Sequence, residues 1–307
     1  MSVKKVEIAV VSFFFLIGLG LASYMNTYET APVIKSDDLY KTIEENKSEY
    51  ERPAEDAWID SVWKKTPGIN GRIVDVQASY EKMKKEGKFN EKLLVYKIIK
   101  PEVMLKDLPA SPIYRGHPDK EMVSFLINVS WGEAYIPDMV ETLSEYQVKA
   151  NFFIDGVFAK EFTPLIRMIE EEGHTIGSHG YAHKDMAKMS KQQAKDNMEL
   201  ADEFLFALTN QKVHYFAPPS GSFTNHTVEA AADLEMETIL WTVDTIDWKK
   251  PTEDVLVERV RTKLHNGATI LMHPTEVTAK SLPALIEMIR KEGYRIGSID
   301  QLLSPAR

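Results

Sequence analysis

The sequence predicts an α/β protein whose main domain, residues 118–307, is a distorted and incomplete (β/α)7 barrel. From Met122 onward, short apolar runs alternate with segments of helical period. Strands and helices that alternate at this spacing form parallel sheets with crossover helices. Seven such strands joined by six helices suit an incomplete barrel better than a long open sheet. We expect a small N-terminal α+β module and a membrane or signal segment before this domain.

The first element, residues 1–25, is predicted to be a signal peptide or a membrane anchor. Lys4 and Lys5 precede an apolar run from Ile8 to Ala22, which is typical of a secretory signal. Gly20-Leu21-Ala22 offers a small-x-small cleavage site, but a poor one, so we slightly favour an uncleaved anchor or a slowly processed signal. The run is shorter than the ~20 residues of a spanning helix. Both alternatives predict an extracytoplasmic protein, membrane-anchored or secreted.

The next two segments are a polar spacer and a small module. Residues 26–66 are polar, with a helix expected from Ser36 to Glu51. Residues 67–117 are predicted to form an α+β module followed by a Pro-rich connector. Its expected elements are a turn at Pro67–Gly71, a strand at Arg72–Val76, a helix at Ala78–Glu86 and a strand at Leu93–Ile99.

The barrel elements follow in order. The predicted strands are Met122–Asn128, Ala150–Ile154, Thr175–Ser178, Val213–Ala217, Glu237–Thr242, Thr269–Met272 and Arg295–Ser298. The predicted helices are Tyr135–Tyr146, Val157–Glu172, Ser190–Thr209, Thr224–Leu234, Thr252–His265 and Ala279–Glu292. Gly173 and Gly293 directly follow two of these helices, as helix-ending glycines should.

Composition and motifs exclude several classes of function. The net charge of -9 and the pI near 5.5 argue against nucleic acid as a partner, because nucleic-acid binding needs a basic surface. The absence of cysteine excludes disulfides, thiol nucleophiles and Cys-type zinc sites. No strand is followed by a G-x-G-x-x-G or Walker pattern, so nucleotide binding is not expected.

Polar residues gather where the predicted strands end, and in a parallel barrel these ends meet at one face. They occur at 128–133, 178–183, 217–221, 244–248 and His273. Within them, His179 and His183 lie four apart in a polar turn, a pattern that suits two ligands of a zinc site. The alternative is that both histidines only stabilise the turn.

Four segments carry a family resemblance over residues 118–303. They are Ser178-His-Gly-Tyr-Ala-His183, Asp244-Thr-Ile-Asp-Trp248, Ile270-Leu-Met-His273 and Ala150-Asn-Phe-Phe-Ile154. Together they resemble the polysaccharide deacetylases, the NodB-homology domain or carbohydrate esterase family four. The sequence is also similar to the sporulation-type deacetylases that carry an N-terminal extension.

Two motifs depart from the family pattern. The first is normally Thr-Phe-Asp-Asp-Gly but reads Asn128-Val-Ser-Trp-Gly132, so Ser130 replaces the catalytic base and Trp131 replaces a metal-binding carboxylate. The third normally begins with Arg and ends in Tyr, but here Ala217 and Ser220 stand at those positions. An arginine buried without its carboxylate would cost about 3–5 kcal/mol, so the losses at Ser130 and Ala217 belong together.

The resemblance implies roles for the remaining residues. It implies a divalent metal, zinc, held by His179 and His183, with Glu133 as a weak substitute for the third ligand that Trp131 cannot supply. His273 would be the catalytic acid, with Asp244 or Asp247 as its partner, although Asp247 and Trp248 are equally consistent with a packing role. The substrate-binding positions implied are Trp131, Pro218, Pro219, Ser220 (whose backbone N–H would stabilise an oxyanion) and Trp248.

Two functions follow from these observations. The favoured one is a family member directed at an N-acetyl sugar polymer of the cell wall or spore wall, such as peptidoglycan or chitin, with hydrolysis impaired or lost. Such a pseudoenzyme would bind the glycan, contact the membrane through its N-terminal segment, and need no metal. The alternative is an active metal-dependent N-deacetylase that uses His179, His183 and a substitute third ligand. The sequence predicts no oligomeric state.

Overall fold

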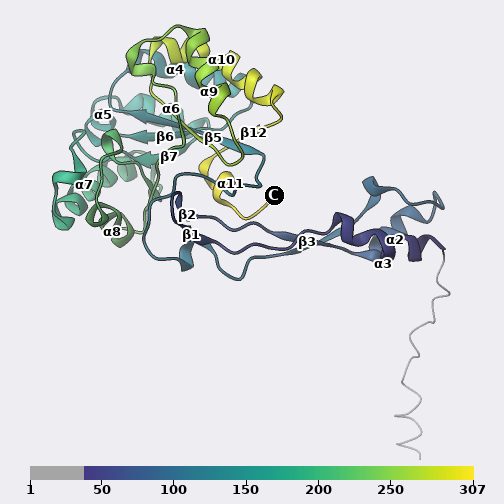
Figure 1. Ribbon diagram of the computed structural model, residues 1–307. Helices are drawn as coiled ribbons and strands as arrows, with labels where there is room; N and C mark the ends of the chain where they lie inside the picture. The colour runs from purple at the N-terminus through teal and green to yellow at the C-terminus, as the bar shows by residue number, and fades with distance from the viewer. Residues whose placement is uncertain (1–37) are drawn as a thin grey trace, which may run out of the picture. The chain divides into compact units, whose positions relative to one another are not determined.

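The structure is a computed structural model that describes residues 38–307, and these form two compact units (Figure 1). Residues 38–50 and 74–96 make the smaller unit, and residues 51–73 and 97–307 make the larger one. The predicted signal or anchor segment lies outside the described residues. Between residues 38 and 307, no helix is long and apolar enough to cross a membrane.

The smaller unit is built from two helices, α2 (Asp38–Tyr50) and α3 (Val76–Met83), and the short helix η1 (Glu91–Leu93). Ile43 and Met83 are fully buried between them. The side chain of Asp75 accepts a hydrogen bond from the backbone N–H of Ala78 and so caps α3. This cap explains why β3 (Gly71–Val74), which pairs with β4 (Tyr96–Ile99), ends before the predicted strand end at Val76.

The boundaries of the two compact units differ from the predicted domain boundaries, which were placed at residues 66 and 117. The helix expected in the spacer belongs to the smaller unit, whereas the hairpin β1 (Trp58–Asp60) and β2 (Lys64–Thr66) belongs to the larger one. Lys64 of this hairpin pairs with Ile113, and Ile113 pairs with Ile239 of the barrel. The hairpin is therefore tied to the barrel through the segment that was expected to be a connector.

A curled parallel half-barrel of seven strands forms the larger unit. Their order is β10 (Val243–Asp244), β11 (Thr269–Met272), β5 (Met122–Val129), β6 (Asn151–Ile154), β7 (Thr175–Ser178), β8 (Tyr215–Phe216) and β9 (Glu237–Thr238), and β12 (Arg295–Ile296) also pairs with β5. The edge strands β9 and β10 are joined by residues 239–242 alone. Since so short a segment spans only a small distance, the sheet has to curl.

This closure corrects the predicted strand Glu237–Thr242, which the structure splits into β9 and a separate β10. The backbone N–H of Ile239 still donates to Phe216, the β8 neighbour. The N–H of Leu240 instead donates to Ile113, and that of Thr242 donates to Thr269, the first residue of β11. The chain thus changes hydrogen-bond partners while it crosses from one sheet edge to the other.

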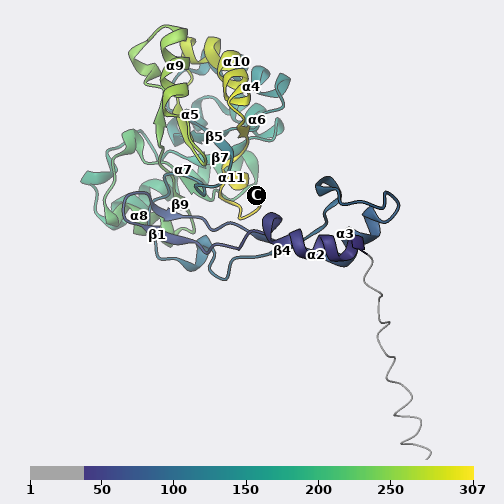
Figure 2. The same cartoon turned by 45° about the vertical axis from the view of Figure 1, so that its right-hand side comes forward.

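Helices surround the strands, and both views show β5 and β7 inside them (Figure 1, Figure 2). They are α4 (Ile136–Glu145), α5 (Gly156–Glu161), α6 (Thr163–Glu171), α7 (Lys191–Thr209), α8 (Asn225–Asp233), α9 (Glu253–Lys263), α10 (Glu276–Lys291) and α11 (Ile299–Leu303). The helix predicted at 157–172 breaks into α5 and α6 at Phe162, because Pro164 has no N–H and its ring would clash with the preceding turn.

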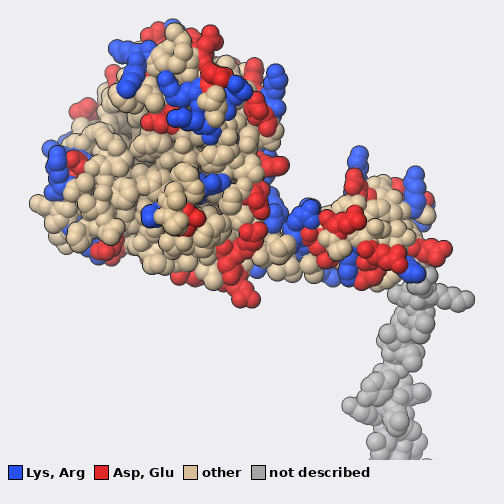
Figure 3. Space-filling view, viewed as in Figure 1, with Lys and Arg blue, Asp and Glu red and all other residues tan. Residues whose placement is uncertain are grey.

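The long strand β5 is buried on both sides. Val123, Phe125 and Ile127 pack under the helices, whereas Met122 and Leu126 join the cluster inside the barrel. Side chains of a strand alternate between its two faces, so Asn128 and then Ser130 follow the interior set at the carboxyl end of β5. In the larger unit as Figure 3 displays it, the middle of the visible face is mostly uncharged, and side chains of both charges lie around it.

Candidate functional site

A cavity of about 350 Å³ lies at the carboxyl ends of the strands. Its lining consists of Asn128, Ser130, Trp131, His179, His183, Ser220, Trp241, Asp244, Trp248, Leu271 and His273. The structure therefore brings together residues from five separate strand ends. Four of the predicted positions are not part of this lining, namely Glu133, Pro218, Pro219 and Asp247.

His179 is a buried residue of the cavity lining. It follows β7 directly, is 2% exposed, and its Nδ1 lies 2.7 Å from the carbonyl oxygen of Ala217. That carbonyl can only accept, so Nδ1 carries the proton and Nε2 is left with a free lone pair. Burial, together with the nearby His183, lowers the pKa of His179 to about 3. The ring is thus neutral at physiological pH, which is the form that metals bind.

His183 completes the histidine pair at the edge of the cavity. Its ring centroid lies 5.3 Å from that of His179, and its backbone is left-handed, with φ 47°. Its backbone N–H donates to Oδ2 of Asp155 at 2.8 Å, and Oδ1 of Asp155 caps α5 by accepting from Val157. Asp155 is a positioning residue that the sequence analysis missed. Its place before Gly156 at the start of a helix was the available signal.

The residues of the site do not fit a catalytic zinc ion. Such an ion takes three protein ligands and one water. His179 and His183 supply two, and between residues 38 and 307 no group of three or more His, Cys, Asp or Glu side chains is placed to hold a metal. Trp131 offers no ligand atom. Glu133, the suggested substitute, starts the short helix η3 (Glu133–Tyr135) as an exposed residue outside the cavity lining.

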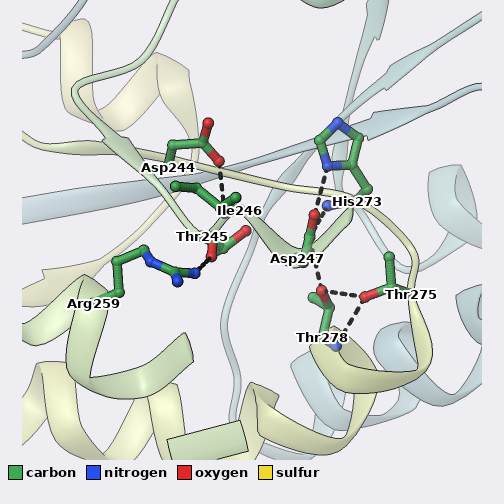
Figure 4. A network of polar contacts seen from close by, with 8 residues as sticks. All are labelled: Asp244, Thr245, Ile246, Asp247, Arg259, His273, Thr275 and Thr278. Carbon is green, nitrogen blue, oxygen red and sulfur yellow. Dashed lines mark hydrogen bonds and ion pairs between the residues drawn. The ribbon is translucent and has the colours of Figure 1, made fainter. Parts of the chain in front are cut away.

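A buried carboxylate orients the third histidine (Figure 4). Asp247 begins the short helix η6 (Asp247–Lys249) and is fully buried. Its Oδ1 lies 2.8 Å from Nδ1 of His273, and its Oδ2 accepts from the backbone N–H of His273 at 2.6 Å and from the Thr278 hydroxyl at 2.8 Å. Burial alone would raise the pKa of Asp247, but the hydrogen bonds and charge of His273 and the bond from Thr278 lower the pKa overall.

The same view separates the two aspartates that the sequence left as alternatives. Oδ1 of Asp244 accepts from the backbone N–H of Ile246 at 2.8 Å, and the dashed contacts of Figure 4 do not link it to His273. Asp247 is therefore the partner of His273, and Asp244 is a separate carboxylate in the cavity wall.

Two exposed tryptophans border the cavity. Trp131 is 46% exposed and stacks on the ring of His273, with 5.9 Å between centroids and 8° between planes. Trp248 is 54% exposed. Both also line a neighbouring cavity of about 810 Å³, together with Tyr135 and the first turns of α9 and α10. Trp131 thus covers the ring of the candidate acid and links two adjoining cavities.

The third-motif segment lines the cavity through one residue only. Ala217 is buried, and its carbonyl holds His179. The short helix η5 (Pro219–Gly221) contains Ser220 in a left-handed conformation, with φ 56°. Ser220 faces the cavity, whereas Pro218 and Pro219, which were expected to form its wall, do not, and Trp241 and Leu271 line it instead.

Gly132 fixes the loop that carries Ser130 and Trp131, and its replacement should be costly. It has φ 89°, and a Cβ atom there would lie 2.0 Å from the carbonyl oxygen of Pro274. We expect Gly132→Ala to lower the free energy of unfolding by about 2–4 kcal/mol through backbone strain and overpacking. Gly293→Ala is the matched control, because Gly293 has φ 91° but nothing within 4 Å. Equal losses in denaturant unfolding would contradict the steric explanation.

Comparisons with known proteins agree with this geometry. Residues 115–239 match the family description "polysaccharide deacetylase". The protein YlxY of Bacillus subtilis strain 168 is 46% identical over 280 residues, which are 91% of this chain and 88% of YlxY. The peptidoglycan-N-acetylmuramic acid deacetylase PdaA of the same organism is 27% identical over 195 residues, 62% of this chain and 74% of PdaA.

A solved structure is similar over most of the chain. It is that of BA3943 from Bacillus anthracis, described as a pseudoenzyme of carbohydrate esterase family four. The TM-score is 0.85 at 46% identity, covering 88% of this chain and 96% of that one. A mutant of BA3943, described as having restored enzymatic activity, matches with the same TM-score at 45% identity, covering 88% of this chain and 99% of that one.

Proposed function

Since the chain belongs to the polysaccharide deacetylase family, we propose that it binds N-acetyl sugar polymers of the bacterial cell wall without hydrolysing them. The observation that carries this proposal is the content of the cavity. It has kept the imidazoles of His179, His183 and His273, but it has no base at Ser130 and no third ligand at Trp131. The proposed role is therefore recognition of a glycan.

The chemistry of amide hydrolysis supports the loss of activity. Water has to lose a proton as it attacks the carbonyl carbon, and a positioned base or a metal provides for this step. A serine hydroxyl without its own base does not accept that proton at neutral pH. His273, held by Asp247, could still protonate a leaving amine, but this step has no role until water has attacked. In this site neither Ser130 nor Trp131 supplies the base or the metal ligand that would generate the nucleophile.

The aromatic surface supports glycan binding. Trp131 and Trp248 expose flat apolar faces beside polar groups, and exposed apolar surface of this kind marks interaction sites. The two cavities they share, of about 350 and 810 Å³, offer adjoining places for successive sugar units. The name of PdaA points to peptidoglycan as one polymer to test, and spore-wall glycan and chitin remain part of the proposal.

Location follows from the same proposal. A ligand in the cell wall requires the folded units to lie outside the cytoplasm. We therefore propose that residues 1–25 direct the chain across the membrane and either anchor it there or are cleaved. Fractionation of cells expressing the full chain tests this, and a cytoplasmic pool without membrane association would contradict it.

Calorimetric titration with N-acetylglucosamine oligomers and peptidoglycan fragments tests the binding function. We expect measurable binding and no acetate release, and Trp131→Ala and Trp248→Ala should each weaken binding roughly tenfold. Trp63→Ala is the control, because Trp63 is 37% exposed in the same unit but lines neither cavity. Binding unaffected by either cavity tryptophan, or weakened equally by Trp63→Ala, would contradict this site as the glycan surface.

A further inference from the structure

A further cavity, of about 360 Å³, lies at the amino ends of β5 and β12. Met122 and Arg295, the first residues of these two strands, line it, and so does Lys120 just before β5. The cavity of the histidines includes Asn128 and Ser130 at the other end of β5, and a strand of eight residues spans roughly 25 Å. The two cavities are therefore separate.

The lining of this cavity is positively charged, although the whole chain has a net charge of -9. It contains three cations, Lys120, Arg295 and Arg307, and one carboxylate, Asp300. Both oxygens of that carboxylate are already engaged, because they accept from hydroxyl groups on β8 and β7 at 2.8 and 3.1 Å. Positive charge is thus concentrated at one place on an acidic protein.

Lys120 brings a buried ammonium group to the cavity. It is 3% exposed, and its Nζ donates to the backbone carbonyl oxygens of Gln301 at 2.5 Å and Ser304 at 2.7 Å. These bonds hold the end of α11, but the acceptors carry no charge. Burial and the nearby charge of Arg295 lower the pKa of Lys120 to about 8, so it is still mostly protonated at neutral pH. A buried ammonium without an opposite charge is unfavourable, and an anion in the cavity would offset this cost.

Arg295 adds a second cation that the fold itself does not use. It is paired in register with Met122, and its exposed guanidinium has no hydrogen-bond or ion-pair partner among residues 38–307. Glu121, which lies between Lys120 and Met122 in the chain, is not part of the lining. The guanidinium of Arg307 donates to backbone carbonyl oxygens, which are also uncharged. Capping of α11 explains Lys120 alone, whereas a bound anion explains why Arg295 stands beside it.

We propose that this cavity binds a phosphate group, either as the free ion or as a phosphomonoester. A phosphomonoester carries about −1.5 to −2 charges at neutral pH, which matches three cations and one carboxylate better than the single charge of an acetate does. Guanidinium groups bind phosphate oxygens through two parallel hydrogen bonds. Arg295 would make these bonds, and Lys120 would contribute its charge from the cavity wall.

Calorimetric titration of the full chain at constant ionic strength tests this inference, with inorganic phosphate, glycerol phosphate and acetate as probes. We expect saturable phosphate binding at least roughly tenfold tighter than that of acetate, and Arg295→Ala should weaken it roughly tenfold. Phosphate should raise the unfolding midpoint of the wild type more than that of Arg295→Ala. Arg167→Ala is the matched control, because Arg167 is an exposed arginine of α6 outside this lining.

The outcomes decide both the site and the source of the phosphate. Absence of saturable phosphate binding by the wild type would overturn the inference. Unchanged affinity in Arg295→Ala, or an equal loss in Arg167→Ala, would overturn it too, and so would acetate binding as tight as that of phosphate. Binding of inorganic phosphate alone would support the site and identify the free ion as its ligand. Binding of glycerol phosphate at least as tightly would support it with an esterified phosphate as the ligand.

Discussion

The triple variant Ser130→Asp, Trp131→Asp and Ala217→Arg is expected to bind zinc and to release acetate from N-acetylglucosamine oligomers. Trp131→Asp would add the third ligand beside His179 and His183, and Ser130→Asp would supply a base at the end of β5. Ala217→Arg would provide the cation that compensates the new base. A positioned base alone contributes about 10²–10⁴-fold to the rate, so turnover should rise from background to a readily measured value.

The controls for this variant separate charge from shape. The first control combines Ser130→Asn, Trp131→Asn and Ala217→Gln. The new side chains are similar in size to those of the charged triple variant but carry no charge, so this control should gain neither zinc nor activity. Adding His179→Ala to the active triple variant should remove both. Ser130→Asp or Ala217→Arg alone should destabilise the fold more than the pair does, because each leaves a buried charge without its partner. If the triple variant gains neither zinc nor acetate release, the cavity differs from an active one at further positions.

Removal of the buried carboxylate of Asp247 is expected to have the largest effect on stability. Asp247→Ala deletes three hydrogen bonds, two from His273 and one from Thr278, at a fully buried position. We expect the free energy of unfolding to fall by about 3–5 kcal/mol, measured by denaturant titration. Asp244→Asn is the control, because Asp244 is partly exposed and should lose less than about 1 kcal/mol.

The pH dependence of stability tests the same network. The pKa of Asp247 is lower in the folded protein than its ordinary value, so the carboxylate stabilises the fold above about pH 4. This contribution is lost as the pH falls through the folded-state pKa. Asp247→Asn should therefore show a shallower decline in unfolding free energy below about pH 4 than the wild type does. The central role of Asp247 would be contradicted if the unfolding free energy of Asp247→Asn declined at acid pH as steeply as that of the wild type. It would also be contradicted if Asp244→Asn showed the same shallower decline as Asp247→Asn.

Most barrel elements could be predicted because their apolar runs are bounded by local signals. β7 lies at the predicted residues, and Ser190 caps α7 where the pattern indicated. The split between β9 and β10 could not be predicted, since Glu237–Thr242 reads as one strand. What divides it is Ile113, a residue more than a hundred positions earlier that takes over the hydrogen bond of Leu240.

The site was predictable to the extent that its residues stand at strand ends. His179, His183, His273 and Trp248 line one cavity, as strand-end convergence suggested. Asp247 rather than Asp244 is the partner of His273 because the chain turns at Ile246, which has a left-handed backbone with φ 51°. A β-branched residue such as isoleucine rarely adopts this conformation, so the sequence gives no indication of the turn. Asp155 was missed because its role depends on which backbone N–H groups lie beside its carboxylate.

The central claim is that this chain kept the glycan cavity of its family but lost the means to activate water. The most direct test is acetate release by the purified full chain from N-acetylglucosamine oligomers and peptidoglycan, with bound zinc measured on the same sample. The account predicts binding of the oligomer, substoichiometric zinc and acetate no higher than in the buffer control. One equivalent of zinc together with clear turnover would contradict it and establish the active deacetylase instead.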